Sequence, residues 1–211
     1  MLKRLSFLFI FYFLFSYQAI ALDNLQFSFR TGLVNGSYSN PLQEGDEEAQ
    51  GNVSSDLENG GFSVVPSMDF ELELFEHSRK SYLARTIIAM DLSSGKMNYN
   101  YLGVGFRNYI RGIGIPRIFV GKDQYIKTIP KRKMYYGYDL GLSRVSVVSF
   151  GSVLSAVSTG IDFGGHFGYT QQMGTNWGFN AQTGLSYAYG ISNVSASGIN
   201  IKMLFGISYS L

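Results

Sequence analysis

The stretch INIKMLFGISYSL, at positions 199–211, shows the pattern that decides the fold. Every second residue from Ile199 to Leu211 is apolar, and the residues between them are polar or small except for Leu204. Successive residues of a β-strand point to opposite faces of a sheet. The stretch therefore predicts a strand with one apolar face and one mostly polar face.

The same period of two recurs along most of the chain. It is clear at 62–74, 160–170 and 177–190, and less pure at 25–35, 81–92, 97–110 and 134–147. Together with the final stretch these segments predict eight strands. The long basic connection at 111–133 leaves an alternative open, because short strands near 117–121 and 124–129 would make ten.

Three features favour a membrane barrel over a soluble sheet protein. The alternating segments run to 11 or more residues, which suits a tilted span of the hydrocarbon. Their polar face carries glycine, serine and charge, which a soluble core could not absorb without unpaired groups. Aromatic residues gather toward the strand ends, as interfacial girdles require: Tyr82, Tyr99, Tyr101, Tyr136, Tyr138, Trp177, Tyr187 and Tyr189. The fold class expected is all-β, an antiparallel up-and-down transmembrane β-barrel.

The first residues predict export. Lys3 and Arg4 precede an apolar run at 5–17, and Ala19 and Ala21 occupy the two positions that a signal peptidase reads. The expected organisation is a signal peptide at 1–21 and a barrel domain at 22–211. Loss of the two basic residues lowers the count of Lys and Arg from 17 to 15, equal to the 15 acids, which gives no general case for nucleic acid. The chain has no cysteine, so no disulfide holds the fold.

With these features the chain resembles the small eight-stranded outer-membrane β-barrels, the class that includes the OmpA transmembrane domain and OmpX. The terminal strand is the most specific element, because Phe205, Ile207, Tyr209 and Leu211 look like the alternating signal that the barrel assembly machinery reads. The resemblance implies a monomer in the bacterial outer membrane, in contact with lipid and lipopolysaccharide. It also implies periplasmic termini and an acidic first loop at 36–60 outside the cell.

If the apolar faces contact lipid, the charged residues of the strands line the lumen. An eight-stranded barrel is just wide enough to be filled by side chains, and buried charges must be paired. We therefore predict a salt-bridge network among the following residues: Arg30, Asp69, Glu71, Glu73, Arg85, Asp91, Arg107, Asp139, Asp162, His166 and Lys202.

Three classes of function remain open from the sequence. A structural scaffold or narrow small-solute pore fits the charged lumen, and a surface adhesin acting through the outer loops fits the acidic first loop. A lipid A-modifying enzyme is the least favoured, because His77 falls in a predicted turn and His166 points inward without the nearby serine of such deacylases. No clustered metal ligands or cofactor motif are visible, so neither catalysis nor a cofactor is predicted.

Overall fold

The computed structural model describes residues 25–38, 62–77, 79–91, 97–111, 117–120, 125–128, 131–148, 155–191 and 197–211. Its strands are β1 (Leu25–Tyr38), β2 (Phe62–His77), β3 (Lys80–Met90), β4 (Met97–Arg111), β5 (Arg117–Val120), β6 (Tyr125–Thr128), β7 (Arg132–Val148), β8 (Ser155–Gln172), β9 (Trp177–Gly190) and β10 (Gly198–Ser210). The predicted signal peptide lies outside the described residues. Among the described residues, no helix has the length and hydropathy needed to cross a membrane.

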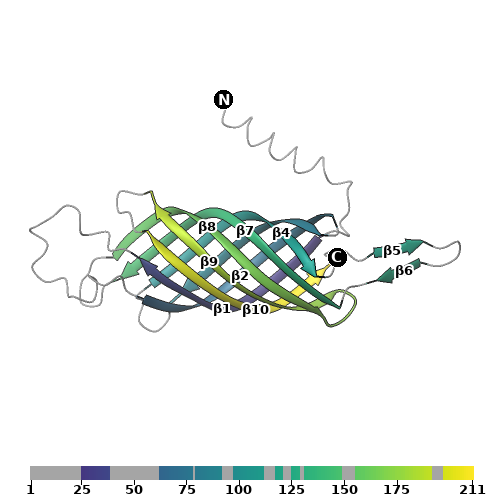
Figure 1. Cartoon of the computed structure of the whole chain (residues 1–211). Coiled ribbons are helices and arrows are strands. Elements are labelled where there is room, and N and C mark those ends of the chain that lie inside the picture. The colour runs from purple at the N-terminus through teal and green to yellow at the C-terminus, as the bar shows by residue number, and fades with distance from the viewer. Residues whose placement is uncertain are drawn as a thin grey trace, which may run out of the picture.

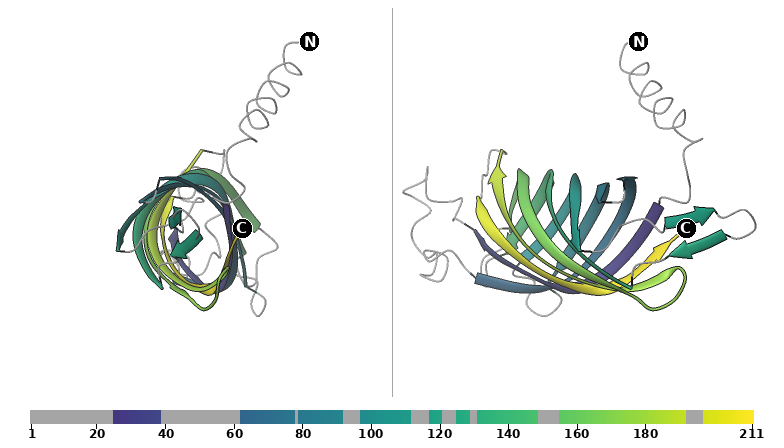
Figure 2. Two further views of the ribbon diagram at one scale, coloured as in Figure 1. Left: turned by 90° about the vertical axis from the view of Figure 1, so that its right-hand side faces the viewer. Right: turned by 45° about the vertical axis from the view of Figure 1, so that its right-hand side comes forward.

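Eight of these strands close into a barrel in the order β1-β2-β3-β4-β7-β8-β9-β10. Figures 1 and 2 show the closed barrel from different sides. All neighbouring strands are antiparallel, and β1 pairs with β10 from Gln26↔Ser210 to Tyr38↔Gly198 to complete the ring. The predicted eight-stranded antiparallel barrel is therefore confirmed.

The ten-stranded alternative was wrong for the barrel, although the two extra strands exist. Strands β5 and β6 form where that alternative expected them, but they pair only with each other. They cannot enter the wall because β4 already pairs directly with β7, from Met97↔Val147 to Arg111↔Met134. The β5–β6 hairpin instead extends away from one end of the barrel (Figure 1).

The two ends of the barrel differ. The tight connections at 77–80 and 172–177, the C-terminus and the β5–β6 hairpin lie at one end, which we call the turn end (Figure 1). The connections at 39–61, 91–96, 149–154 and 191–197 leave from the other, the loop end. Most of the predicted outer loop at 36–60 lies outside the described residues.

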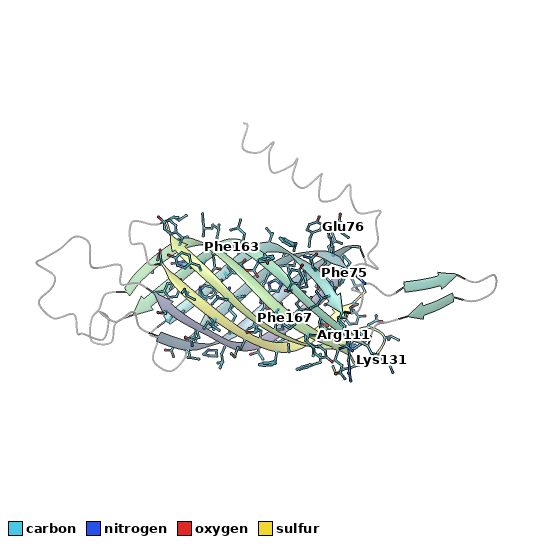
Figure 3. The ribbon with its side chains drawn as sticks, viewed as in Figure 1. Phe75, Glu76, Arg111, Lys131, Phe163 and Phe167 are labelled. Carbon is cyan, nitrogen blue, oxygen red and sulfur yellow. The ribbon has the colours of Figure 1, made fainter. Side chains whose placement is uncertain are left out.

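Most of the outward-facing side chains of the barrel are apolar. Phe70, Leu185 and Ile207 point outward with 44%, 57% and 43% of their surface exposed, and Figure 3 shows Phe163 and Phe167 on the same outer face of β8. The hydroxyls of the outward-facing Thr31 and Thr86 donate to the backbone carbonyls of Ser67 and Tyr101 at 3.1 and 3.0 Å. A surface with so much apolar area suits the hydrocarbon of a bilayer.

The aromatic girdle differs from the prediction at two positions. Six of the expected residues are outward and exposed: Tyr82, Tyr136, Tyr138, Trp177, Tyr187 and Tyr189. Tyr99 and Tyr101 are instead 0% and 2% exposed and point into the lumen. They share the inward face of β4 with Arg107, opposite the outward face that carries Leu102 and Val104, so their parity sends them inside.

Candidate functional site

Charged side chains fill the lumen, and their signs balance. Among the residues whose burial the structure describes, the buried acidic and basic side chains are five acids (Asp69, Glu71, Glu73, Asp139 and Asp162), five bases (Arg30, Arg85, Arg107, Lys133 and Lys202), and His166. Lys133 was missed, because the sequence grouped it with the basic connection at 111–133; its inward parity on β7 was the available signal. Asp91, which was predicted to belong to the lumen charges, is half-buried and lies just beyond the end of β3 at Met90.

Arg30 lies at the centre of the buried charges. Its Nε is 2.7 Å from Asp69 Oδ2 and its Nη2 is 2.6 Å from Glu71 Oε2. Asp69 sits directly across the β1–β2 ladder from Arg30, so the backbone register alone brings this pair together. Both carboxylates and the guanidinium have 0% exposed side chains, which makes these ion pairs fully desolvated. Removing one partner of such a pair leaves an uncompensated buried charge.

Arg107 extends the network toward the turn end. Its Nη2 is 2.7 Å from Glu71 Oε2, the same oxygen that Arg30 contacts, and its Nη1 is 2.6 Å from Glu73 Oε2. The guanidinium also lies 4.0 Å above the ring of Tyr135. The other oxygen of Glu73 accepts hydrogen bonds from Tyr109 Oη at 2.6 Å and from the Ser81 hydroxyl.

Asp139 and His166 close the network into a ring. Arg85 is 3.0 Å from Asp69 and 3.3 Å from Asp139, and Asp139 Oδ2 is 3.0 Å from His166 Nδ1. The other ring nitrogen of His166 accepts from Arg107 Nε at 3.4 Å. Seven side chains therefore form a closed cycle in which acids and bases alternate, except at the contact between His166 and Arg107; in order they are Arg107, Glu71, Arg30, Asp69, Arg85, Asp139 and His166. Such hydrogen bonds polarise one another in a low-dielectric interior.

A smaller group lies nearer the loop end. Asp162 accepts a hydrogen bond from Tyr99 Oη at 2.8 Å, and Lys202 Nζ lies 3.8 Å from its other oxygen. The same ammonium is 4.8 Å from the ring centroid of Tyr101 and 5.4 Å from that of Tyr99. The rings of Tyr99 and Tyr101 thus both contact the Lys202 ammonium, and the Tyr99 hydroxyl binds Asp162. These two tyrosines therefore belong to the lumen and not to the interfacial girdle.

Apolar layers cover both ends of the charged region. At the turn end Phe75, Tyr109 and Tyr135 form a buried aromatic cluster. At the loop end a larger buried cluster crosses the lumen; its members are Val34, Tyr38, Val65, Ile87, Ala89, Met97, Tyr99, Tyr101, Val145 and Ala188. The sequence did not indicate this layer, because inward positions were expected to be polar. Among the described residues, the charged region of the lumen thus lies between two apolar layers.

The comparisons with known proteins bear on the fold alone. No protein-family model matches the chain, and no curated protein matches its sequence. The solved structure of Neisserial surface protein A is similar at a TM-score of 0.53 and 14% identity, over 88% of this chain and 97% of that one. The N-terminal β-barrel domain of Pseudomonas aeruginosa OprF gives a TM-score of 0.44 at 9% identity, over 88% of this chain and 97% of that one. The attachment invasion locus protein Ail of Yersinia pestis gives a TM-score of 0.39 at 11% identity, over 87% of this chain and 98% of that one.

The chain has the fold of the small eight-stranded outer-membrane barrels. This fold and the apolar exterior together place the chain in the bacterial outer membrane, which barrels of this kind span. The resemblance to this class that the sequence indicated is thus confirmed at the level of the fold.

The remaining residues that the sequence singled out lie apart from the lumen charges. Phe205, Ile207 and Leu211 are 53%, 43% and 40% exposed. Phe205 and Ile207 lie on β10 along the seam with β1, and Leu211 follows the strand and donates its backbone N–H to Leu25 O at 3.0 Å. His77 ends β2, and its side chain lies outside the described part of the structure. Within the described residues, no three histidine, aspartate or glutamate side chains are placed to hold a metal ion.

Glycines on the inner face make room for the large lumen side chains. A Cβ added to Gly168 would overlap the ring of Tyr135, which stands directly across the β7–β8 ladder. The inward position opposite Tyr135 on β8 therefore requires glycine, because any larger residue would overlap the tyrosine ring.

Replacing Gly168 with alanine is expected to lower the free energy of unfolding by about 1–3 kcal/mol, the usual cost of overpacking. Gly165 on the same strand is the matched control, because a Cβ there would meet its nearest atom, on Tyr138, at an ordinary 3.7 Å. Urea titration of both variants in lipid vesicles measures the difference. Equal stability of Gly168→Ala and Gly165→Ala would contradict the packing at Tyr135.

Proposed function

We propose that the chain is a closed, non-conducting scaffold in the outer membrane. The observation that carries the proposal is an apolar layer at the loop end of the lumen, which lies in series with a neutral ring of paired charges. Val34, Val65 and Ile87 in that layer are each 0% exposed. A narrow ion pathway needs polar groups that can replace the water around an ion, and an apolar constriction opposes this.

The paired charges support the same proposal. Five acids and five bases share the lumen, and the ring nitrogens of His166 contact Asp139 on one side and Arg107 on the other. A neutral imidazole, donating from Nδ1 and accepting at Nε2, completes this arrangement without adding charge. With its nitrogens engaged inside the wall, His166 serves the polar core, and we propose no catalytic role for it.

The proposal includes two partners. Outer-membrane lipid covers the apolar exterior, and the barrel assembly machinery engages the outward row Phe205, Ile207, Tyr209 and Leu211 on the last strand. Assembly as a monomer is in keeping with a barrel whose described lumen acids each lie within ion-pair distance of a lumen base rather than of a group at an interface.

Single-channel recording in a planar bilayer tests the closed state. The refolded protein, shown to be folded by its gel shift, is expected to give no steady current. A small reproducible conductance that changes in the Arg107→Gln and Glu71→Gln variants would contradict the closed scaffold and would instead indicate a gated narrow pore. The exposed Arg144→Gln is the matched control, because its side chain is outside the lumen and should not alter any current.

A further inference from the structure

Exposed positive charge is concentrated at one place on the barrel. Six lysine and arginine side chains are exposed among those whose burial the structure describes, and five lie at the turn end; they are Arg79, Lys80, Arg111, Lys131 and Arg132. The sixth, Arg144, lies toward the loop end of β7. Figure 3 shows Arg111 and Lys131 close to the same rim, with Glu76 also at that end.

These five residues form one continuous arc, which we call the basic arc. They come from the turn that joins β2 to β3, from the end of β4 and from the start of β7, and these strands are neighbours in the wall. The backbone carbonyl of Arg79 accepts a hydrogen bond from Tyr109 N at 2.8 Å, which ties the turn to β4. On the opposite arc, the described side chains at the turn ends of β8, β9, β10 and β1 are uncharged.

The depth of the basic arc matches the headgroup region of a bilayer. Lys80 shares the outward face of β3 with Tyr82, two residues along the strand. Arg132 shares the outward face of β7 with Tyr136 and Tyr138, which are 41% and 45% exposed. Tyrosine rings of such girdles sit at the membrane–water interface, and basic side chains just beyond them reach the level of the lipid phosphates.

We propose that the basic arc binds the phosphate groups of anionic phospholipids in the leaflet at the turn end. The side chains of Lys80 and Arg132 point outward from the barrel, on the side that faces lipid. A membrane lipid can contact them there directly, whereas a soluble polyanion would have to enter the bilayer to do so. Glu76 is the exposed carboxylate on this side, and the five bases outweigh it. Positive charge at a membrane surface attracts anionic lipid within about a Debye length.

Two reporters on opposite sides of the barrel can measure this preference. Trp177 is the only tryptophan of the chain and stands on β9, away from the basic arc. The double variant W177F/Y136W moves the reporter to the outward face of β7. Each protein is refolded in phosphatidylcholine vesicles that contain brominated phosphatidylglycerol or, at the same mole fraction, brominated phosphatidylcholine, and the tryptophan quenching is compared.

The tryptophan at position 136 is expected to report roughly fivefold selectivity for phosphatidylglycerol, about the contribution of one basic residue near a membrane surface. Trp177 should report almost none. The selectivity at position 136 should disappear in K80Q/R111Q/K131Q/R132Q and on raising the salt concentration, whereas Arg144→Gln should leave it unchanged. Because salt acts on the unaltered arc, the proposal stays testable even if the fourfold variant does not fold.

Equal selectivity at the two reporters, or a preference that survives both salt and charge removal, would overturn the proposal. Binding of a soluble polyanion such as heparin without any lipid selectivity would also overturn it. The gel shift of each variant establishes folding independently of lipid choice. The test is separate from the conductance test, since a barrel can select anionic lipid whether or not it conducts.

Discussion

Replacing Arg107 with alanine is expected to lower the free energy of unfolding in lipid vesicles by about 3–5 kcal/mol, the range observed when one partner of a buried ion pair is removed. The guanidinium contacts Glu71 at 2.7 Å and Glu73 at 2.6 Å, and all three side chains are fully buried. Without it, Glu73 keeps hydrogen bonds from Tyr109, Ser81 and Gln26, which offset only part of its charge. The cost therefore comes mainly from the carboxylates that remain.

Urea titration followed by gel shift measures this effect, with Arg144→Ala as the matched control. Arg144 is exposed, so its removal should change stability by no more than about 0.5 kcal/mol. A second variant, Arg107→Ala combined with Glu73→Gln, should recover part of the loss because it removes one of the uncompensated charges. If Arg107→Ala and Arg144→Ala were equally stable, the buried ring would not contribute as its geometry indicates.

The alternation of residue types predicted the wall of the barrel closely. The predicted segment at 177–190 coincides with β9, and those at 97–110 and 62–74 fall short of β4 and β2 by one and three residues. Agreement is good because side chains that face lipid must be apolar at nearly every second position. The prediction missed the start of β8, which begins at Ser155, because serine and alanine at 155–160 do not separate the two faces.

The interior was predicted less well, for two different reasons. Tyr99 and Tyr101 were assigned to the interface from their residue type, although the parity of Leu102 and Val104 in the same strand already sent them inward. The apolar layer at Val34 and Val65 was missed because the lumen was treated as uniformly polar. An interior sealed from water needs only to be filled, and apolar side chains do that without needing partners.

The pairing of the lumen charges could not be predicted from the sequence. Glu71 stands directly across the β2–β3 ladder from Arg85, yet its closest ion pairs are with Arg30 and Arg107. Arg85 instead contacts Asp69 and Asp139. Long side chains reach across the bore to strands far away in sequence, so partner choice depends on barrel closure and on the stagger of all eight strands.

Placing lysine at Leu185 is expected to cost about 2–4 kcal/mol of folding free energy in vesicles, the cost of a basic side chain at the bilayer midplane. Leu185 is 57% exposed and lies across β9–β10 from the outward Ile201 and across β8–β9 from Gly165, so a lysine there faces hydrocarbon. Phe70, on the outward face of β2, should respond in the same way, and so should Ile207 on β10.

Tyr189 supplies the control for depth in the bilayer. It lies on the same outward face of β9 and is 60% exposed, but it is one residue from the end of the strand. Lysine at position 189 can reach the interface, and its cost should fall to about 0–1 kcal/mol. The difference in cost between positions 185 and 189 separates the effect of the bilayer from any general cost of lysine on this strand. Equal costs at 185 and 189 would mean that the exposed apolar belt does not follow the hydrocarbon, and normal folding with lysine at Phe70, Leu185 and Ile207 would reverse the assignment of inner and outer faces.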